Sequence, residues 1–306
     1  NILNGGLFST SNNVSVHQAW GQYFLTPSLS LKLGRQELVY DDERIFGASN
    51  WDQQGRSHDV ALLRYDGVLK IDVGAAFNQN QRHLNGAYYN LNNYKMMQFV
   101  WLNTDIVDNL NLSLLFLNNG YQYDYRLFEN GTNNSMTKNI FNQTFGGRMM
   151  LTPGDFNFHA SAYYTMGKDT EDRDLSAFYV GLGLDYELAD NWDLGIGWEH
   201  LSGTDQKDMI ENPDTYKNKS FNPFYGSSHK FNGFMDYFNA NDNWSNSVGS
   251  IVYGFDADAA YRIHPFGQRE LSLGNGDSGE NNARIVAEKN DTANRGQYWA
   301  MTMINL

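Results

Sequence analysis

The chain has 306 residues, no cysteine and a formal net charge of −13 at pH 7. Without cysteine there is no disulfide framework and no cysteine-ligated metal site. The acidic balance lacks the basic footprint of a protein that binds nucleic acid. No run of about 18 apolar residues is present, so the sequence predicts no transmembrane helix.

Alternation of apolar and polar residues recurs along the chain and predicts β-strands. The clearest strands are expected at 69–78, 156–166, 177–188, 192–198 and 251–263. Fainter ones are expected at 14–25, 29–38, 58–66, 97–106, 110–117, 144–152, 283–288 and 297–306. The total is about a dozen to fourteen strands.

The pair at 177–200 indicates what kind of sheet this is. Its apolar side chains share one face, small and charged ones share the other, and the tight turn falls at 189–191. The strands approach the roughly 9–11 residues that cross a bilayer at a tilt, and aromatic residues lie near their ends, as in an interfacial girdle. We therefore predict an all-β fold, a transmembrane antiparallel β-barrel of about 14–18 strands.

The predicted loops are polar segments between the strands. They are 79–95, 118–137, 203–220, 239–247 and 264–282. No repeat or linker divides the chain, so we expect a single barrel domain over 1–306. Barrels of this kind commonly finish on an aromatic residue, whereas this chain ends on Leu306, so we expect some terminal residues to be missing.

Two irregular segments interrupt the alternation. The first, 31–65, contains Gly34-Arg35-Gln36, then Arg44 to Gly47, Trp51, and Gly55-Arg56 followed by Asp59. The second, 218–238, contains Phe224-Tyr225-Gly226, His229-Lys230-Phe231 and Gly233 to Phe238. In these motifs the chain resembles the alginate export family of outer-membrane proteins, particularly its Bacteroidetes-type members. The resemblance implies a monomeric barrel of about 18 strands that passes an anionic polysaccharide or another solute.

The charges expected to face the pore argue against a polyanion. The inward positions include Lys70, Arg148 and Arg262 against a larger set of acids: Asp72, Asp185, Glu187, Asp193, Glu199, Asp256 and Asp258. Rings of acidic side chains favour cations, so alginate is a doubtful solute.

Arginines cluster in the first motif, at Arg35, Arg44, Arg56 and Arg64. At one constriction they would form a ladder for carboxylates, since guanidinium groups bind carboxylates in bidentate geometry. The alternative is that they pair with acids of the same segment and pin a loop inside the barrel. Those acids are Glu37, Asp41, Asp42, Glu43 and Asp59.

Other candidate sites are weaker. His229, Lys230 and Asp236 lack the spacing of a helical zinc site, and we interpret them as a loop network. Tyr163 and Tyr179 are expected to face the lumen, where aromatic rings can stack on sugars. No G-x-S-x-G or H-E-x-x-H motif is present, so we predict no catalytic residue, no metal and no cofactor.

Three hypotheses follow from the sequence. The first is an outer-membrane channel or porin for a polysaccharide or small polar solute. The second is a barrel that mainly scaffolds an outer-membrane protein complex, its lumen plugged by the irregular segments, and the third, disfavoured one is an outer-membrane enzyme. The expected location is the bacterial outer membrane, with lipid, lipopolysaccharide, a saccharide or other polar solute, and outer-membrane proteins as partners.

Overall fold

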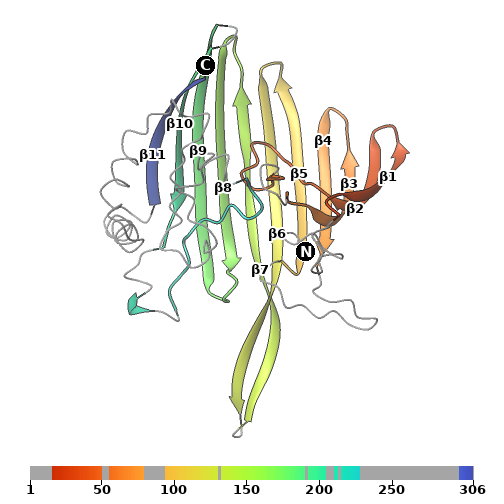
Figure 1. Ribbon diagram of the computed structural model, residues 1–306, viewed down its shortest axis with the longest axis vertical. Coiled ribbons are helices and arrows are strands. Elements are labelled where there is room, and N and C mark those ends of the chain that lie inside the picture. Colours follow the sequence, from red (N-terminus) through yellow and green to blue (C-terminus); the bar gives the residue numbers. More distant parts are fainter. Residues whose placement is uncertain are drawn as a thin grey trace.

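The computed structural model describes residues 16–49, 55–78, 94–129, 132–189, 192–204, 210–212, 215–227 and 296–305. Eleven strands form one sheet, in which each strand pairs with its sequence neighbours (Figure 1). The pairings are antiparallel throughout. The strands are β1 (Ala19–Thr26), β2 (Leu29–Gln36), β3 (His58–Tyr65), β4 (Leu69–Phe77), β5 (Met96–Val107), β6 (Leu110–Glu129), β7 (Thr132–Leu151), β8 (Phe156–Lys168), β9 (Asp174–Ala189), β10 (Trp192–Ser202) and β11 (Gly296–Asn305).

The strands predicted from alternation are confirmed wherever the structure describes them. The predictions at 69–78, 156–166, 177–188 and 192–198 correspond to β4, β8, β9 and β10. The predicted strands 251–263 and 283–288, and the predicted loops 239–247 and 264–282, lie outside the described residues.

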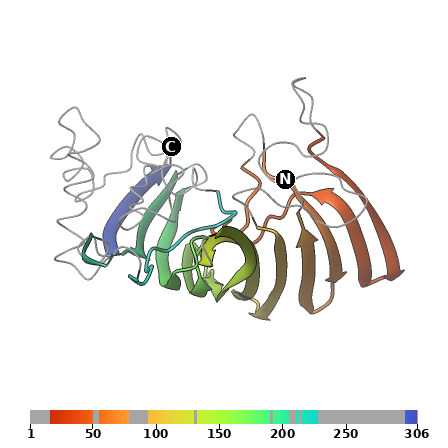
Figure 2. The ribbon, with the colours of Figure 1, turned by 90° about the horizontal axis from the view of Figure 1, so that it is seen from below.

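The sheet curves into a trough, which Figure 2 shows from below. Within the described residues β1 and β11 form its two edges, so the total of about 14–18 strands stays a prediction. Short turns join β1 to β2, β3 to β4, β5 to β6 and β7 to β8 at one end of the sheet. The longer connections from β2 to β3 and from β4 to β5 lie at the other end, together with the tip of the β6–β7 hairpin (Figure 1). In outer-membrane barrels the short turns mark the periplasmic end and the longer loops the extracellular end.

The convex face of the sheet is apolar and exposed. Alternate residues of the strands place large hydrophobic side chains there, among them Leu63, Val73, Leu114, Phe116, Phe145, Phe178, Leu182 and Leu184. Water would penalise such a continuous apolar surface, whereas lipid does not. The lipid-facing side predicted for 177–188 is thereby confirmed.

The predicted loop at 118–137 is wrong, because β6 and β7 continue through most of it as a paired hairpin. Each strand has 20 residues, which at about 3.3 Å per residue extends roughly 66 Å. Neighbouring strands pair only as far as Gly120 and Asn142, so the hairpin projects beyond the sheet (Figure 1). Polar residues such as Gln122 and Asp124 suit a strand that leaves the membrane. The same polarity is typical of loops, which is why the sequence predicted a loop here.

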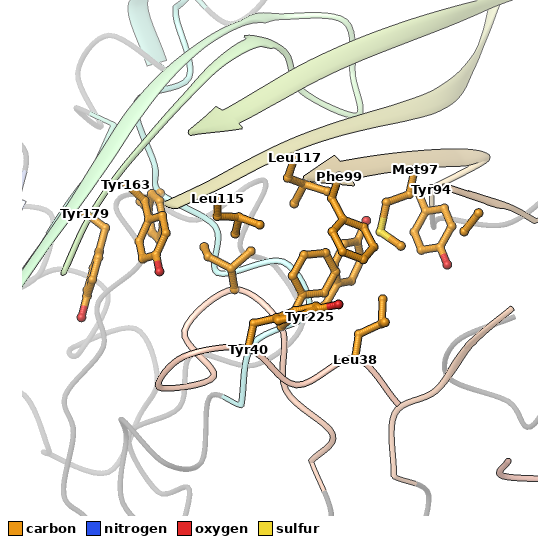
Figure 3. Packing of buried hydrophobic residues seen from close by; sticks show 14 of the residues in the cluster. Leu38, Tyr40, Tyr94, Met97, Phe99, Leu115, Leu117, Tyr163, Tyr179 and Tyr225 are labelled. Carbon is orange, nitrogen blue, oxygen red and sulfur yellow. The ribbon is translucent and has the colours of Figure 1, made fainter. Parts of the chain in front are cut away.

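The concave face carries the buried core. Side chains from β5 to β9, including Phe99, Leu115, Leu117, Tyr163 and Tyr179, pack there with residues that belong to no strand, such as Leu38, Tyr40 and Tyr225 (Figure 3). The apolar interior of this protein is thus built between the barrel wall and two segments lying inside the trough.

Candidate functional site

The connection from β2 to β3 folds back onto the concave face. We call residues 37–49 the inner loop. Leu38, Ile45 and Phe46 are almost completely buried, and the Phe46 ring lies 5.0 Å from the Phe99 ring of β5. The apolar residues of this loop therefore anchor it to the wall of the barrel.

A second segment, residues 215–227, holds the inner loop from its other side. We call it the inner segment. Phe46 and Tyr225 form an isolated parallel bridge, supported by backbone hydrogen bonds from Gly47 N to Tyr225 O (2.8 Å) and from Tyr225 N to Ile45 O (3.1 Å). The Tyr225 hydroxyl donates to Asn119 Oδ1 of β6 at 2.7 Å. The two motifs, far apart in sequence, thus meet at one place inside the trough.

Consecutive polar residues of the inner loop reach different strands of the wall. The Tyr40 hydroxyl donates to Asp72 Oδ2 of β4 at 2.8 Å. The next residue, Asp41, accepts a hydrogen bond from Trp101 Nε1 of β5 at 3.2 Å. These contacts attach the start of the loop to the β4–β5 side of the trough.

The following residues reach the opposite side. Asp42 accepts a hydrogen bond from Ser161 Oγ of β8 at 3.1 Å and lies 3.5 Å from the Arg148 guanidinium of β7. Arg44 pairs with Glu199 of β10 at 2.7 Å, with side chains only 1% and 5% exposed. Residues 40–44 thus contact strands from β4 to β10.

Sharp backbone turns in residues 40–44 allow their side chains to contact strands on both sides of the trough. Asp41 and Glu43 have positive φ values of 53° and 68°, a region that residues other than glycine adopt infrequently. Asp42 Oδ1 also accepts a hydrogen bond from the Arg44 backbone N–H at 3.1 Å. The left-handed residues direct neighbouring side chains toward opposite sides of the trough.

Burial alters the acid–base behaviour of the loop. It raises the pKa of the Tyr40 phenol well above its ordinary value, and the nearby Asp72 carboxylate raises it further. Tyr40 therefore stays protonated and donates to Asp72. Burial likewise raises the pKa of the Asp41 carboxyl, although hydrogen bonds from Ser113 and Trp101 oppose the rise.

The four motif arginines lie at separate points, each with its own partner. Arg35 pairs with Asp59 through hydrogen bonds of 2.9 and 2.6 Å, and strand alternation places both on the outer face near the long-connection end of the sheet. Arg56 donates to the carbonyl oxygens of Gly226, at 2.8 Å, and Tyr225. Arg64 pairs with Asp72 at 2.8 Å on the concave face.

The acidic candidates Asp185, Glu187 and Glu199 share the concave face. Register pairs Asp185 with Gly195, Glu187 with Asp193 and Glu199 with Gly181. His159 of β8 lies 3.6 Å from Asp185. Lys70 occupies the same face of β4 as Asp72. Arg262, His229, Lys230 and Asp236 lie outside the described residues.

Tyr163 and Tyr179 face the interior but are covered, so they offer no open surface to a sugar. Both are 3% exposed. The Tyr179 ring stacks on Phe221 of the inner segment, with centroids 5.5 Å apart, and the Arg44 guanidinium lies 4.5 Å above it. These rings support the inner loop.

Sequence reasoning missed Tyr40, Asp72 and Tyr225 as the groups that hold the inner loop. A signal was present: Leu38, Ile45 and Phe46 are apolar residues in a stretch otherwise rich in charge. Across the described residues, no cluster of histidine and carboxylate side chains is arranged to hold a metal ion. No helix in the same part of the chain is long and apolar enough to cross a membrane.

A comparison with models of protein families identifies the family of this chain. The model of a family described as alginate export matches residues 9–243. The chain belongs to the alginate export family. Membership and the lipid-facing wall place it in the bacterial outer membrane. No curated protein matches the chain.

Solved structures of outer-membrane proteins are similar to this family member at low identity. OmpT of Vibrio cholerae has 14% identity and a TM-score of 0.40, covering 58% of this chain and 56% of that one. OccK5 (OpdH) of Pseudomonas aeruginosa has 13% identity and a TM-score of 0.38, covering 58% and 46%. OprB of Pseudomonas putida has 14% identity and a TM-score of 0.38, covering 60% and 53%. The chain thus spans about half the length of these structures.

Proposed function

We propose that this protein is a substrate-selective outer-membrane channel whose lumen is narrowed by the inner loop and the inner segment. The observation that carries the proposal is the attachment of residues 40–44 to strands from β4 to β10 on the concave face. A loop held at several points across the wall has a fixed position, as a size filter requires.

The proposed solute is a polar molecule, a saccharide or a smaller compound, that is not a polyanion. The motif arginines already have carboxylate or carbonyl partners, which reduces their capacity to bind a polyuronate. The inward acids Asp185 and Glu187 would repel such a chain over a Debye length of roughly 8 Å at physiological salt.

Planar-bilayer recording of the purified protein tests the proposal. We expect discrete ion-permeable openings and, in a KCl gradient, a reversal potential that indicates a preference for cations. The absence of any openings would overturn the channel and favour the scaffold hypothesis. Strong anion selectivity would leave the channel intact and overturn the proposed solute class.

A further inference from the structure

A small cavity with both apolar and polar lining groups lies where the inner segment meets the wall at the long-connection end of the sheet. Its volume is about 30 Å³, and it is lined by side chains of β6 to β9, of the β8–β9 turn and of the inner segment. Those used here are Tyr121, Asn142, Thr165, Asp169, Asn218 and Ser220. The lining contains amides and hydroxyls, and no lysine, arginine or histidine of the described residues is part of it.

Most of these polar groups are already engaged with one another. Asn218 Nδ2 donates to Asp169 Oδ2 at 2.9 Å, and its Oδ1 accepts from Ser220 N at 2.9 Å. Thr165 shares a hydrogen bond of 2.8 Å with Thr144. The network fixes the lining in place, so the cavity is preformed.

Asn142 differs from these groups. Its side chain is 3% exposed and its Nδ2 donates to Lys168 O at 3.2 Å, but its Oδ1 has no hydrogen-bond partner among the described residues. An unpaired buried acceptor costs about 1–3 kcal/mol. A donor that enters the cavity would remove this cost, and the volume suits one hydroxyl group or one water molecule.

The charge of the cavity selects against anions. Among the described residues, Asp169 is the carboxylate that lines the cavity, and it is neutralised by Arg173 at 2.7 Å. A ligand carboxylate would therefore find no unbalanced cation here, whereas an uncharged hydroxyl meets acceptors and donors.

Aromatic rings lead from the cavity onto the projecting hairpin. Tyr121 lines the cavity, and Tyr123 and Tyr125 follow on the same face of β6, since alternate residues of a strand share a face. Their rings are 6.2 Å apart and nearly parallel, at 12°. Lys138 of β7 lies 5.5 Å from the Tyr123 ring and pairs with Asp172 of the turn that bounds the cavity.

We infer that this region is an extracellular binding site for an uncharged saccharide. One sugar hydroxyl enters the cavity and donates to Asn142 Oδ1, while neighbouring sugar rings lie along the tyrosines of the hairpin. Apolar and aromatic walls with a few placed polar groups are the usual composition of a small-molecule site. The inference deepens the proposed function by naming the class of solute, and binding here does not require the channel to conduct.

Saccharide binding to the purified protein in detergent micelles tests the inference. The probe is maltohexaose, compared with a mannuronate hexasaccharide, by isothermal titration calorimetry and saturation-transfer NMR. We expect saturable maltohexaose binding that is at least tenfold tighter than mannuronate binding. Replacing Tyr123 and Tyr125 together by alanine, or Asn142→Leu, is expected to weaken it at least tenfold.

The controls separate binding from folding and from conduction. Tyr65→Ala removes an exposed tyrosine at the opposite end of the sheet and should bind like the wild type. If Asn142→Leu lowers the yield of the heat-modifiable folded form, Thr170→Val tests the cavity from its exposed turn. No saturable binding at millimolar maltohexaose, tighter mannuronate binding, or unchanged binding by the variants would overturn the inference. Binding without bilayer currents would overturn the channel but not this site.

Discussion

The buried ion pair between Arg44 and Glu199 is the most direct place to perturb the inner loop. The two side chains are 1% and 5% exposed and meet at 2.7 Å. In Arg44→Ala the cation is lost while Glu199 stays on β10, still close to the Tyr179 hydroxyl at 3.3 Å. The variant therefore leaves a buried carboxylate without its charged partner.

The expected cost follows from this geometry. Removing one partner of a buried ion pair costs about 3–5 kcal/mol, which at about 1.4 kcal/mol per tenfold is roughly a hundredfold to several thousandfold in equilibrium constant. Relaxation of Glu199 toward water and the remaining contacts of Tyr40, Asp41 and Asp42 reduce the observed effect. We expect the population of the released loop to rise at least tenfold.

Cysteine labelling measures that population, because the chain contains no cysteine of its own. Ala48 is a small residue of the inner loop and is 2% exposed, so Ala48→Cys reports on release with little change in volume. We expect a charged maleimide to label it slowly in the parent and at least tenfold faster when Arg44→Ala is added. Lys168→Gln, which breaks an exposed pair with Asp174, is the matched control.

The double change Arg44→Met with Glu199→Met distinguishes charge from shape. Replacing both members of a buried pair by apolar residues is often close to neutral, so labelling should return toward the parent rate. Equal labelling in the parent and in Arg44→Ala would refute the reasoning that this pair holds the loop.

Three further predictions concern the wall and the loop. Gly146→Ala should abolish refolding into the heat-modifiable form, because a Cβ there would lie 2.0 Å from the Ala162 carbonyl oxygen. The control Gly197→Ala should refold normally, because the atom nearest to its added Cβ lies 3.7 Å away. Equal refolding yields of the two variants would contradict this prediction. Tyr225→Phe removes the 2.7 Å hydrogen bond to the buried Asn119 and should lower the free energy of unfolding in urea by about 1–3 kcal/mol. An unchanged midpoint of the urea unfolding curve would contradict this prediction. Because burial raises the pKa of Asp41, docking of the loop should weaken as the pH rises from the ordinary carboxyl range through the raised pKa. Asp41→Asn should flatten the pH dependence of Ala48→Cys labelling above the ordinary carboxyl range, and an unchanged profile would count against this.

Alternation was sufficient to predict the membrane-crossing strands among the described residues. In β9 and β10 the lipid requires an apolar residue at every second position, so the sequence of 177–200 predicted both the lipid-facing side and the turn. The hairpin beyond Gly120 could not be read the same way, because water surrounds it and imposes no such pattern. Its Asn-rich sequence is typical of loops although its backbone pairs as a ladder.

The inner loop exposes another limit of sequence reasoning. The sequence located the charged residues of 31–65 and named Asp59, the partner of Arg35, among the acids that could pair with them. It did not locate the partner of Arg44, because Glu199 lies 155 positions away and only the curvature of the sheet brings it near. The acids beside Arg44 in sequence instead contact Trp101 and Ser161. The Bacteroidetes-type resemblance and the candidates Arg262, His229, Lys230 and Asp236 stay predictions.

Unitary conductance of a shortened variant tests most directly whether the inner loop narrows the channel. Replacing residues 39–48 by a short Gly-Ser linker removes the contacts to β4, β5, β8 and β10 while leaving the strands intact. We predict discrete openings of the wild type and a clearly larger unitary conductance of the variant in the same salt. Equal conductance of the two proteins would contradict the account.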